Sequence, residues 1–94
     1  MKYEIQRTTQ FKKDYKLSVK RGLNIDKLKS IIVKLSSGES LPIENKDHNL
    51  INSRNYKNMR ECHIEPDWLL VYKISEDIML ISLERTGTHS DLFK

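Results

Sequence analysis

The sequence predicts an α+β fold in the order βααβββ, with an antiparallel sheet covered on one face by an N-terminal basic helical hairpin. Two early segments have apolar residues at helical spacing, and three later segments are apolar enough for strands. Turns too short for a crossover join those three segments, which indicates a meander. A chain of 94 residues, 37% hydrophobic and 32% charged, is suited to a single domain over residues 1–94.

The first predicted elements are a strand and a helix. Residues 2–7 alternate, with Tyr3 and Ile5 on one face, as in a strand. Thr8 or Thr9 can then cap a helix that ends near residue 21, before Gly22. Its predicted apolar stripe consists of Phe11, Tyr15 and Val19.

A second helix follows at once. Asn24 can cap it and Asp26 lies in its first turn, where a negative charge is favourable. The run Ser36-Ser37-Gly38 is expected to end it. Its apolar face consists of Ile25, Leu28, Ile32 and Leu35.

Residues 39–58 lack periodicity and are predicted to be mostly loop, with a short extended piece near Asn49 to Ile51. Strands are expected at residues 59–64, 68–74 and 78–84, joined by turns at Glu65-Pro66-Asp67-Trp68 and Ser75-Glu76-Asp77. Residues 68–72 are all apolar, which predicts a central strand covered on both faces. The sheet face away from the helices is expected to form a concave floor for function.

Positive charge is concentrated at the N-terminus. Residues 1–38 contain ten Lys and Arg against three acids, whereas residues 39–94 contain seven against ten. Such a basic face favours a polyanionic partner, because each neutralised phosphate releases counterions. Four lysines off the apolar stripe are the candidates for docking on RNA: Lys12, Lys13, Lys16 and Lys20. The alternatives are a solvated helix surface or an acidic protein partner.

Other classes of protein are disfavoured. Cys62 is the only cysteine, so an intrachain disulfide framework is excluded. No apolar run approaches the ~18 residues that span a bilayer, and the N-terminus lacks an apolar signal region. We therefore expect a cytoplasmic protein with no membrane partner.

Histidines and carboxylates at element ends are the candidates for chemistry. His63 and Asp67 flank a tight turn, and His89 stands in a polar stretch after the last strand. Histidine suits proton transfer because its unperturbed pKa of ~6.5 lies near working pH. Arg85 can hold a phosphate and Phe93 can stack on a base.

Each candidate has a structural alternative. His63 can be a packing residue and Asp67 a turn former, while His48 can be plain surface. Arg85 can pair across the sheet. Trp68 is placed in the substrate site, with a role in the core as its alternative.

The sequence resembles the YafQ branch of the RelE-like toxins of bacterial type II toxin-antitoxin systems. The resemblance rests on Asp47-His48-x-Leu50, on Arg60-Glu61-Cys62-His63-Ile64-x-Pro66-Asp67-Trp68-x-Leu70-x-Tyr72, and on Arg85-Thr86-Gly87-Thr88-His89-Ser90-Asp91-Leu92-Phe93. It implies a ribosome-dependent messenger-RNA endonuclease that needs no cofactor. Its partners would be the ribosome with its message and an acidic, DNA-binding antitoxin encoded beside it.

The resemblance also implies roles for particular residues. The family's catalytic histidines fall on His48, His63 and His89, its catalytic carboxylate on Asp67 and its C-terminal aromatic on Phe93. One departure is the piece Lys57-Asn58-Met59-Arg60, where family members usually have a glycine. Asparagine is the best substitute at a positive φ, so we expect Asn58 to keep the turn.

Three other hypotheses concern the same residues. A zinc site is disfavoured because no CxxC or HxxxH occurs, and because Cys62 and His63 should project to opposite faces of one strand. A non-catalytic toxin of the RelE/ParE fold could act by binding a protein target. A nucleic-acid-binding module without chemistry would need only the basic helices.

Overall fold

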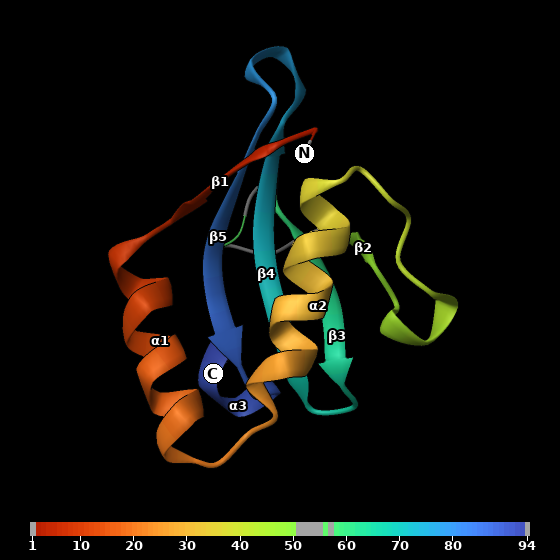
Figure 1. The fold of residues 1–94 in the computed structure, drawn as a ribbon. Helices are drawn as coiled ribbons and strands as arrows, with labels where there is room; N and C mark the ends of the chain where they lie inside the picture. The colour runs from red at the N-terminus through yellow and green to blue at the C-terminus, as the bar shows by residue number, and fades with distance from the viewer. Residues whose placement is uncertain (1, 51–55, 57, 94) are drawn as a thin grey trace.

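A computed structural model describes residues 2–50, 56 and 58–93 of the chain. In this part of the chain a five-stranded sheet has the strand order β1-β5-β4-β3-β2 (Figure 1). The strands are β1 (Glu4–Arg7), β2 (His48–Asn49), β3 (Arg60–Glu65), β4 (Trp68–Ser75) and β5 (Leu80–Gly87). The helices are α1 (Thr9–Lys20), α2 (Ile25–Ser36) and α3 (His89–Leu92), with 3₁₀ turns η1 (Ile43–Asn45) and η2 (Glu76–Ile78).

The sheet confirms the predicted βααβββ order and the meander of β3, β4 and β5. One strand pair departs from the predicted antiparallel sheet: β1 pairs with β5 in parallel, from Glu4 beside Leu80 to Arg7 beside Leu83. Strands β1 and β5 lie near opposite ends of the sequence, so no short turn between them fixes their relative direction. The short extended piece is observed as β2, one residue earlier than expected; Ile51 lies outside the described residues.

The helix boundaries follow the predicted capping residues. Thr8 caps α1 by accepting a hydrogen bond from the Phe11 amide, and Gly22 and Gly38 adopt φ values of 74° and 75° after the two helices. Asn24 occupies the cap position of α2 without a side-chain hydrogen bond. In Figure 1, α2 crosses in front of β4 while α1 lies beside β5.

The apolar stripe of α1 differs from the prediction. Val19 is 51% exposed, and the buried residues of the helix are Phe11, Asp14 and Ser18. Asp14 is buried because α1 lies beside the end of β5, where its carboxylate accepts from Arg85 and from the Thr86 amide. Ser18 is buried with its hydroxyl donating to the Asp14 carbonyl oxygen one turn earlier. On α2, Leu28 and Leu35 are buried as expected, whereas Ile25 and Ile32 are only partly buried. Ile31, which was not predicted, is also buried.

Hydrophobic residues cover both faces of β4, as expected for a central strand. From Trp68 to Tyr72 every residue is at most 2% exposed. The core on the helix side includes Leu28, Cys62 and Tyr72. A smaller cluster on the other face consists of Tyr56, Leu69, Val71 and Leu92, with Leu50 and Met59 packed against it. That face is therefore not the open concave floor that was predicted, because loop residues and α3 cover its centre.

Turn residues determine where the strands end. Asn58 adopts a φ of 60°, which confirms its expected role. The turn between β3 and β4 contains Pro66 and Asp67, and a register shift lies between His63 and Glu65. At the other end of β4, the chain forms η2 and then a positive φ at Met79. Strand β5 therefore begins at Leu80, two residues later than expected. Among the helices that the structure describes, none combines the length and apolar character needed to cross a membrane.

Candidate active site

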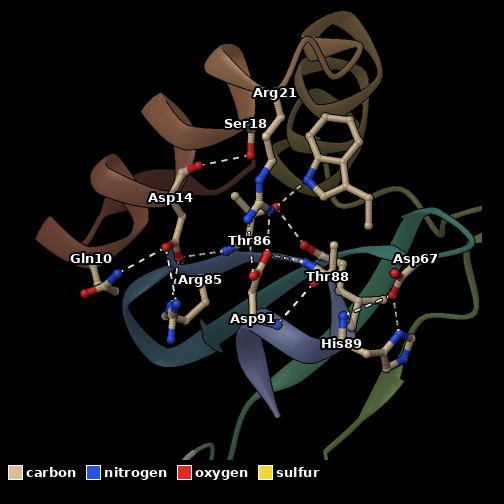
Figure 2. A network of polar contacts seen from close by, with 12 residues as sticks. Gln10, Asp14, Ser18, Arg21, Asp67, Arg85, Thr86, Thr88, His89 and Asp91 are labelled. Atoms are coloured by element: carbon tan, nitrogen blue, oxygen red, sulfur yellow. Dashed lines mark hydrogen bonds and ion pairs between the residues drawn. The ribbon is translucent and has the colours of Figure 1, made fainter. Parts of the chain in front are cut away.

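The polar stretch after β5 forms the short helix α3, which begins beside the turn between β3 and β4. Thr88 and Asp91 form a capping box: the Thr88 hydroxyl accepts from the Asp91 amide at 3.1 Å, and the Asp91 carboxylate accepts from the Thr88 amide at 2.9 Å. His89 is the first residue of α3 and lies next to Asp67 (Figure 2). The capped start of α3 therefore brings His89 next to Asp67, although the two residues are far apart in the sequence.

Asp67 and His89 form a hydrogen-bonded pair. Oδ1 of Asp67 lies 3.1 Å from the His89 amide nitrogen and 2.8 Å from Nδ1 of its ring. The amide of His89, and then its ring, lower the pKa of the Asp67 carboxyl. An ionised carboxylate only accepts hydrogen bonds, so Nδ1 of His89 is the donor and Nε2 remains for another reactant.

The rings of His63 and His89 are 5.6 Å apart, with His63 on β3. Nε2 of His63 lies 3.4 Å from Oε1 of Glu61, and its Nδ1 lies 3.2 Å from the Pro66 carbonyl oxygen. Both ring nitrogens thus face acceptors, an arrangement in which a protonated imidazole can donate twice. A proton delivered from this ring to a reactant must therefore come from one of these two contacts.

Glu61 is a site residue that the sequence did not indicate. It is 5% exposed, and the same oxygen that faces His63 lies 3.9 Å from Nε2 of His48. Strand alternation places Glu61 and His63 on one face of β3, and β2 brings His48 opposite Glu61. The sequence did contain a signal for Glu61: it lies two residues before His63, so both side chains point to the same face of a strand.

Arg85 and Phe93 adjoin the histidines through Tyr56. Nη1 of Arg85 lies 3.4 Å from the Tyr56 hydroxyl, which donates to the Leu92 carbonyl oxygen at 2.9 Å. The Tyr56 and Phe93 rings meet edge to face at 5.4 Å, and Phe93 lies 6.2 Å from the His89 ring. Phe93 is 38% exposed, so it has surface available for a base. Tyr56 lay in a segment without periodicity and was missed.

The structure separates other candidates from this group. The prediction placed Trp68 in the substrate site, but its side chain is 2% exposed in the helix-side core, where Nε1 donates to Thr86. It has no surface for a substrate. Cys62 is buried on that same side, as alternation predicted, and burial raises the pKa of its thiol. The four candidate docking residues, Lys12, Lys13, Lys16 and Lys20, are all exposed on α1.

A possible metal-ligand set was also missed. One ligand atom from each of Glu61, His63 and His89 lies within 4.8 Å of the others. Sequence spacing did not reveal this set, because β3 and α3 bring its members together across the fold. A carboxylate and two imidazoles are ligands that suit transition metals.

The capping box gives a prediction about pH. Arg21 and, after it, the Thr88 amide lower the pKa of Asp91. A lowered folded pKa means that the stabilisation is present above the unfolded value of about 4 and is lost as pH falls further. We expect Asp91→Asn to cost about 1 kcal/mol at pH 7 and progressively less below pH 4. Thermal unfolding across a pH series measures this, with exposed Asp77→Asn as control; parallel curves for Asp91→Asn and parent would contradict it.

Comparisons with known proteins match nearly the whole chain. A family profile described as "Bacterial toxin of type II toxin-antitoxin system, YafQ" matches residues 3–94. The "mRNA interferase toxin YafQ" of Escherichia coli strain B is 43% identical over 91 residues, covering 96% of this chain and 95% of the relative. The protein of strain K12 with the same description is 42% identical over 91 residues.

Solved structures share the whole fold. YafQ in the E. coli DinJ-YafQ toxin-antitoxin complex superimposes with a TM-score of 0.87 at 40% identity, over 100% of both chains. A metal-bound toxin from Helicobacter pylori gives a TM-score of 0.89 at 37% identity, over 97% of this chain and 99% of that one. These matches are consistent with the RelE-like fold predicted from the sequence.

Proposed function

This chain belongs to the YafQ family of bacterial type II toxins, and we propose that it cleaves messenger RNA on the ribosome by metal-independent acid-base catalysis. It is an mRNA interferase toxin, as its relatives are. The observation that carries the mechanism is the meeting of His63, His89 and Asp67 beside one exposed turn. The pairing of β1 with β5 supports a single toxin domain over residues 1–94.

Cleavage of RNA without a metal needs a base and an acid. The base removes the proton of the ribose 2′-OH, whose oxygen attacks the adjacent phosphorus. The bond from phosphorus to the 5′-oxygen breaks, and the acid protonates that leaving oxygen. The products are a 2′,3′-cyclic phosphate and a 5′-hydroxyl.

We assign the base to His89. Its Nδ1 donates to ionised Asp67, which leaves the lone pair of Nε2 free to take the 2′-OH proton and stabilises the imidazolium that forms. We assign the acid to His63, because its ring lies 5.6 Å from that of His89. Its Nε2–H, which faces Glu61 at 3.4 Å, turns from Glu61 to the leaving 5′-oxygen in this step. His48 adjoins Glu61 and is a secondary member of the site.

The remaining groups bind rather than transfer protons. Arg85 can hold the scissile phosphate as charge develops, and Phe93 can stack on a neighbouring base. The exposed lysines of α1 suit docking on ribosomal RNA. We further propose a cognate antitoxin, since the solved E. coli relative is bound to one, and a cytoplasmic site of action, where ribosomes translate.

Metal dependence and product chemistry test this mechanism. We expect cleavage to persist when EDTA chelates transition metals while Mg²⁺ in excess over EDTA keeps the ribosomes intact, which sedimentation in the same buffer confirms. The 5′ fragment should end in a 2′,3′-cyclic phosphate or a 3′-phosphate, which enzymatic end-labelling identifies. An ion held by Glu61, His63 and His89 would instead activate water and leave a 3′-hydroxyl. Loss of cleavage in EDTA with recovery on adding zinc or copper would refute the proposal.

A further inference from the structure

Asp14 of α1 is a buried carboxylate that the mechanism above does not use. Its side chain is 8% exposed, and hydrogen bonds reach both of its oxygens. Nε of Arg85 donates to Oδ2 at 2.7 Å and Nη2 to Oδ1 at 3.2 Å. The Thr86 amide donates to Oδ2 at 3.1 Å, and Gln10 donates to Oδ1 at 3.1 Å. Figure 2 shows these groups converging on Asp14 from α1 and β5.

This geometry fixes the guanidinium of Arg85. A paired contact through Nε and Nη2 sets both the position and the plane of the group, unlike a single ion-pair contact. Nη1 also donates to the Tyr56 hydroxyl, so the plane is held at its opposite end. Each terminal nitrogen still keeps one N–H beyond these contacts, available to a phosphate oxygen.

A bulge in β5 contributes to the same arrangement. The register between β4 and β5 shifts beside Glu84, immediately before Arg85. The Thr8 hydroxyl, at the start of α1, donates to the Glu84 carbonyl oxygen at 3.0 Å. Bulges redirect the side chains that follow them, and here the next side chain reaches Asp14. The start of α1 therefore contacts the bulge through Thr8, and Asp14 of the same helix binds the redirected Arg85.

Arg85 connects this arrangement to the site. Tyr56, which accepts from Arg85, packs on Phe93, and Phe93 lies beside His89. A shift of the guanidinium would change its distance to any phosphate held between His63 and His89. Misplacement of a binding group by about 1 Å can cost on the order of 100-fold in rate.

We propose that Asp14 is a positioning residue of the reaction: it holds Arg85 in the orientation in which the guanidinium binds the scissile phosphate. The proposal rests on the function proposed above, in which Arg85 binds that phosphate. Asp14 does not contact the reacting atoms itself. Its effect on the reaction passes through Arg85.

The test combines steady-state cleavage of a translated message with a direct observation of Arg85. The variants are Asp14→Asn, Arg85→Gln and the double variant, with exposed Asp26→Asn as the matched control. We expect Asp14→Asn and Arg85→Gln each to lower kcat by about 10- to 100-fold with little change in KM. The double variant should be no worse than Arg85→Gln alone, because Asp14 acts only through Arg85.

Proton–nitrogen NMR of the Arg85 Nε–H provides a readout independent of activity. We expect a protected Nε–H signal in the parent and in Asp26→Asn, and its loss in Asp14→Asn. Asp14→Glu retains the charge pair if Asp14→Asn folds poorly. We expect Asp14→Glu to fold normally, because the charge pair is kept. We expect it still to lower kcat, because the extra methylene displaces the carboxylate that holds Arg85.

Three outcomes would overturn the proposal. The first is full activity of folded Asp14→Asn or Asp14→Glu, and the second is a double variant whose losses multiply. The third is full activity of Arg85→Gln, which would make the pair a structural contact between α1 and β5. That last result leaves the His89 and Asp67 mechanism standing, since His89→Ala tests the proton transfers separately.

Discussion

Replacement of His89 by alanine is expected to abolish growth arrest and to lower message cleavage by about 10²- to 10⁴-fold, the usual contribution of an acid-base group. The His89 side chain is 53% exposed and contacts Asp67, which is itself 67% exposed. Removal of the ring leaves in place the hydrogen bond from the backbone amide of residue 89 to Asp67. It also leaves the capping box of α3 intact. We therefore expect a change of less than about 1 kcal/mol in the free energy of unfolding.

The measurement is cleavage of a translated message by purified variant, with thermal unfolding recorded on the same preparation. Ser90→Ala is the matched control, because Ser90 is the next residue of α3 and is also exposed. Full activity of folded His89→Ala would exclude His89 from proton transfer. It would also favour the two non-catalytic hypotheses, a toxin that binds a protein target or a nucleic-acid-binding module, since neither needs this ring.

Local signals in the sequence predicted much of the fold. Thr8, Gly22 and Gly38 bound the helices as expected, and Asn58 adopts the positive φ inferred from its place in the motif. Side-chain alternation along β3 correctly predicted that Cys62 lies in the core, on the face opposite His63. These features depend on neighbouring residues, whose influence a sequence pattern records directly.

Features set by distant parts of the chain were missed. The parallel pairing of β1 with β5 joins residues about as far apart as this chain allows. Helix α3 follows from a capping box that is visible in the sequence, but its effect on His89 depends on the turn at Asp67. The partner of Arg85 was sought across the sheet, and it is Asp14 of α1.

The same limit applies to the candidate site. His63, Asp67 and His89 were predicted together by resemblance, and the structure places them in contact. Glu61 and Tyr56 were not predicted, because one resembles an ordinary strand acid and the other lies in an irregular loop. Both become significant only through neighbours that are distant in sequence. Trp68 was assigned to the substrate site and belongs to the core.

Reversing the charge of Lys12, Lys13, Lys16 and Lys20 to glutamate is expected to weaken ribosome association severely. All four side chains are exposed on α1, whereas Phe11, Asp14 and Ser18 form its buried edge. Each phosphate contact contributes roughly 0.7 to 0.9 to the slope of log affinity against log salt. Loss of four contacts should therefore lower that slope by about 3.

Ribosome co-sedimentation across a salt series measures this effect, beside circular dichroism as a check of folding. Lys73→Glu is the control, because Lys73 is exposed on β4 and lies outside the basic helices. The buried edge of α1 is unchanged in the quadruple variant, so Asp14 should still hold Arg85 and the histidines should keep their places. If the folded quadruple variant co-sediments like the parent with the same salt slope, these lysines form only a solvated surface. Docking must then depend on other residues.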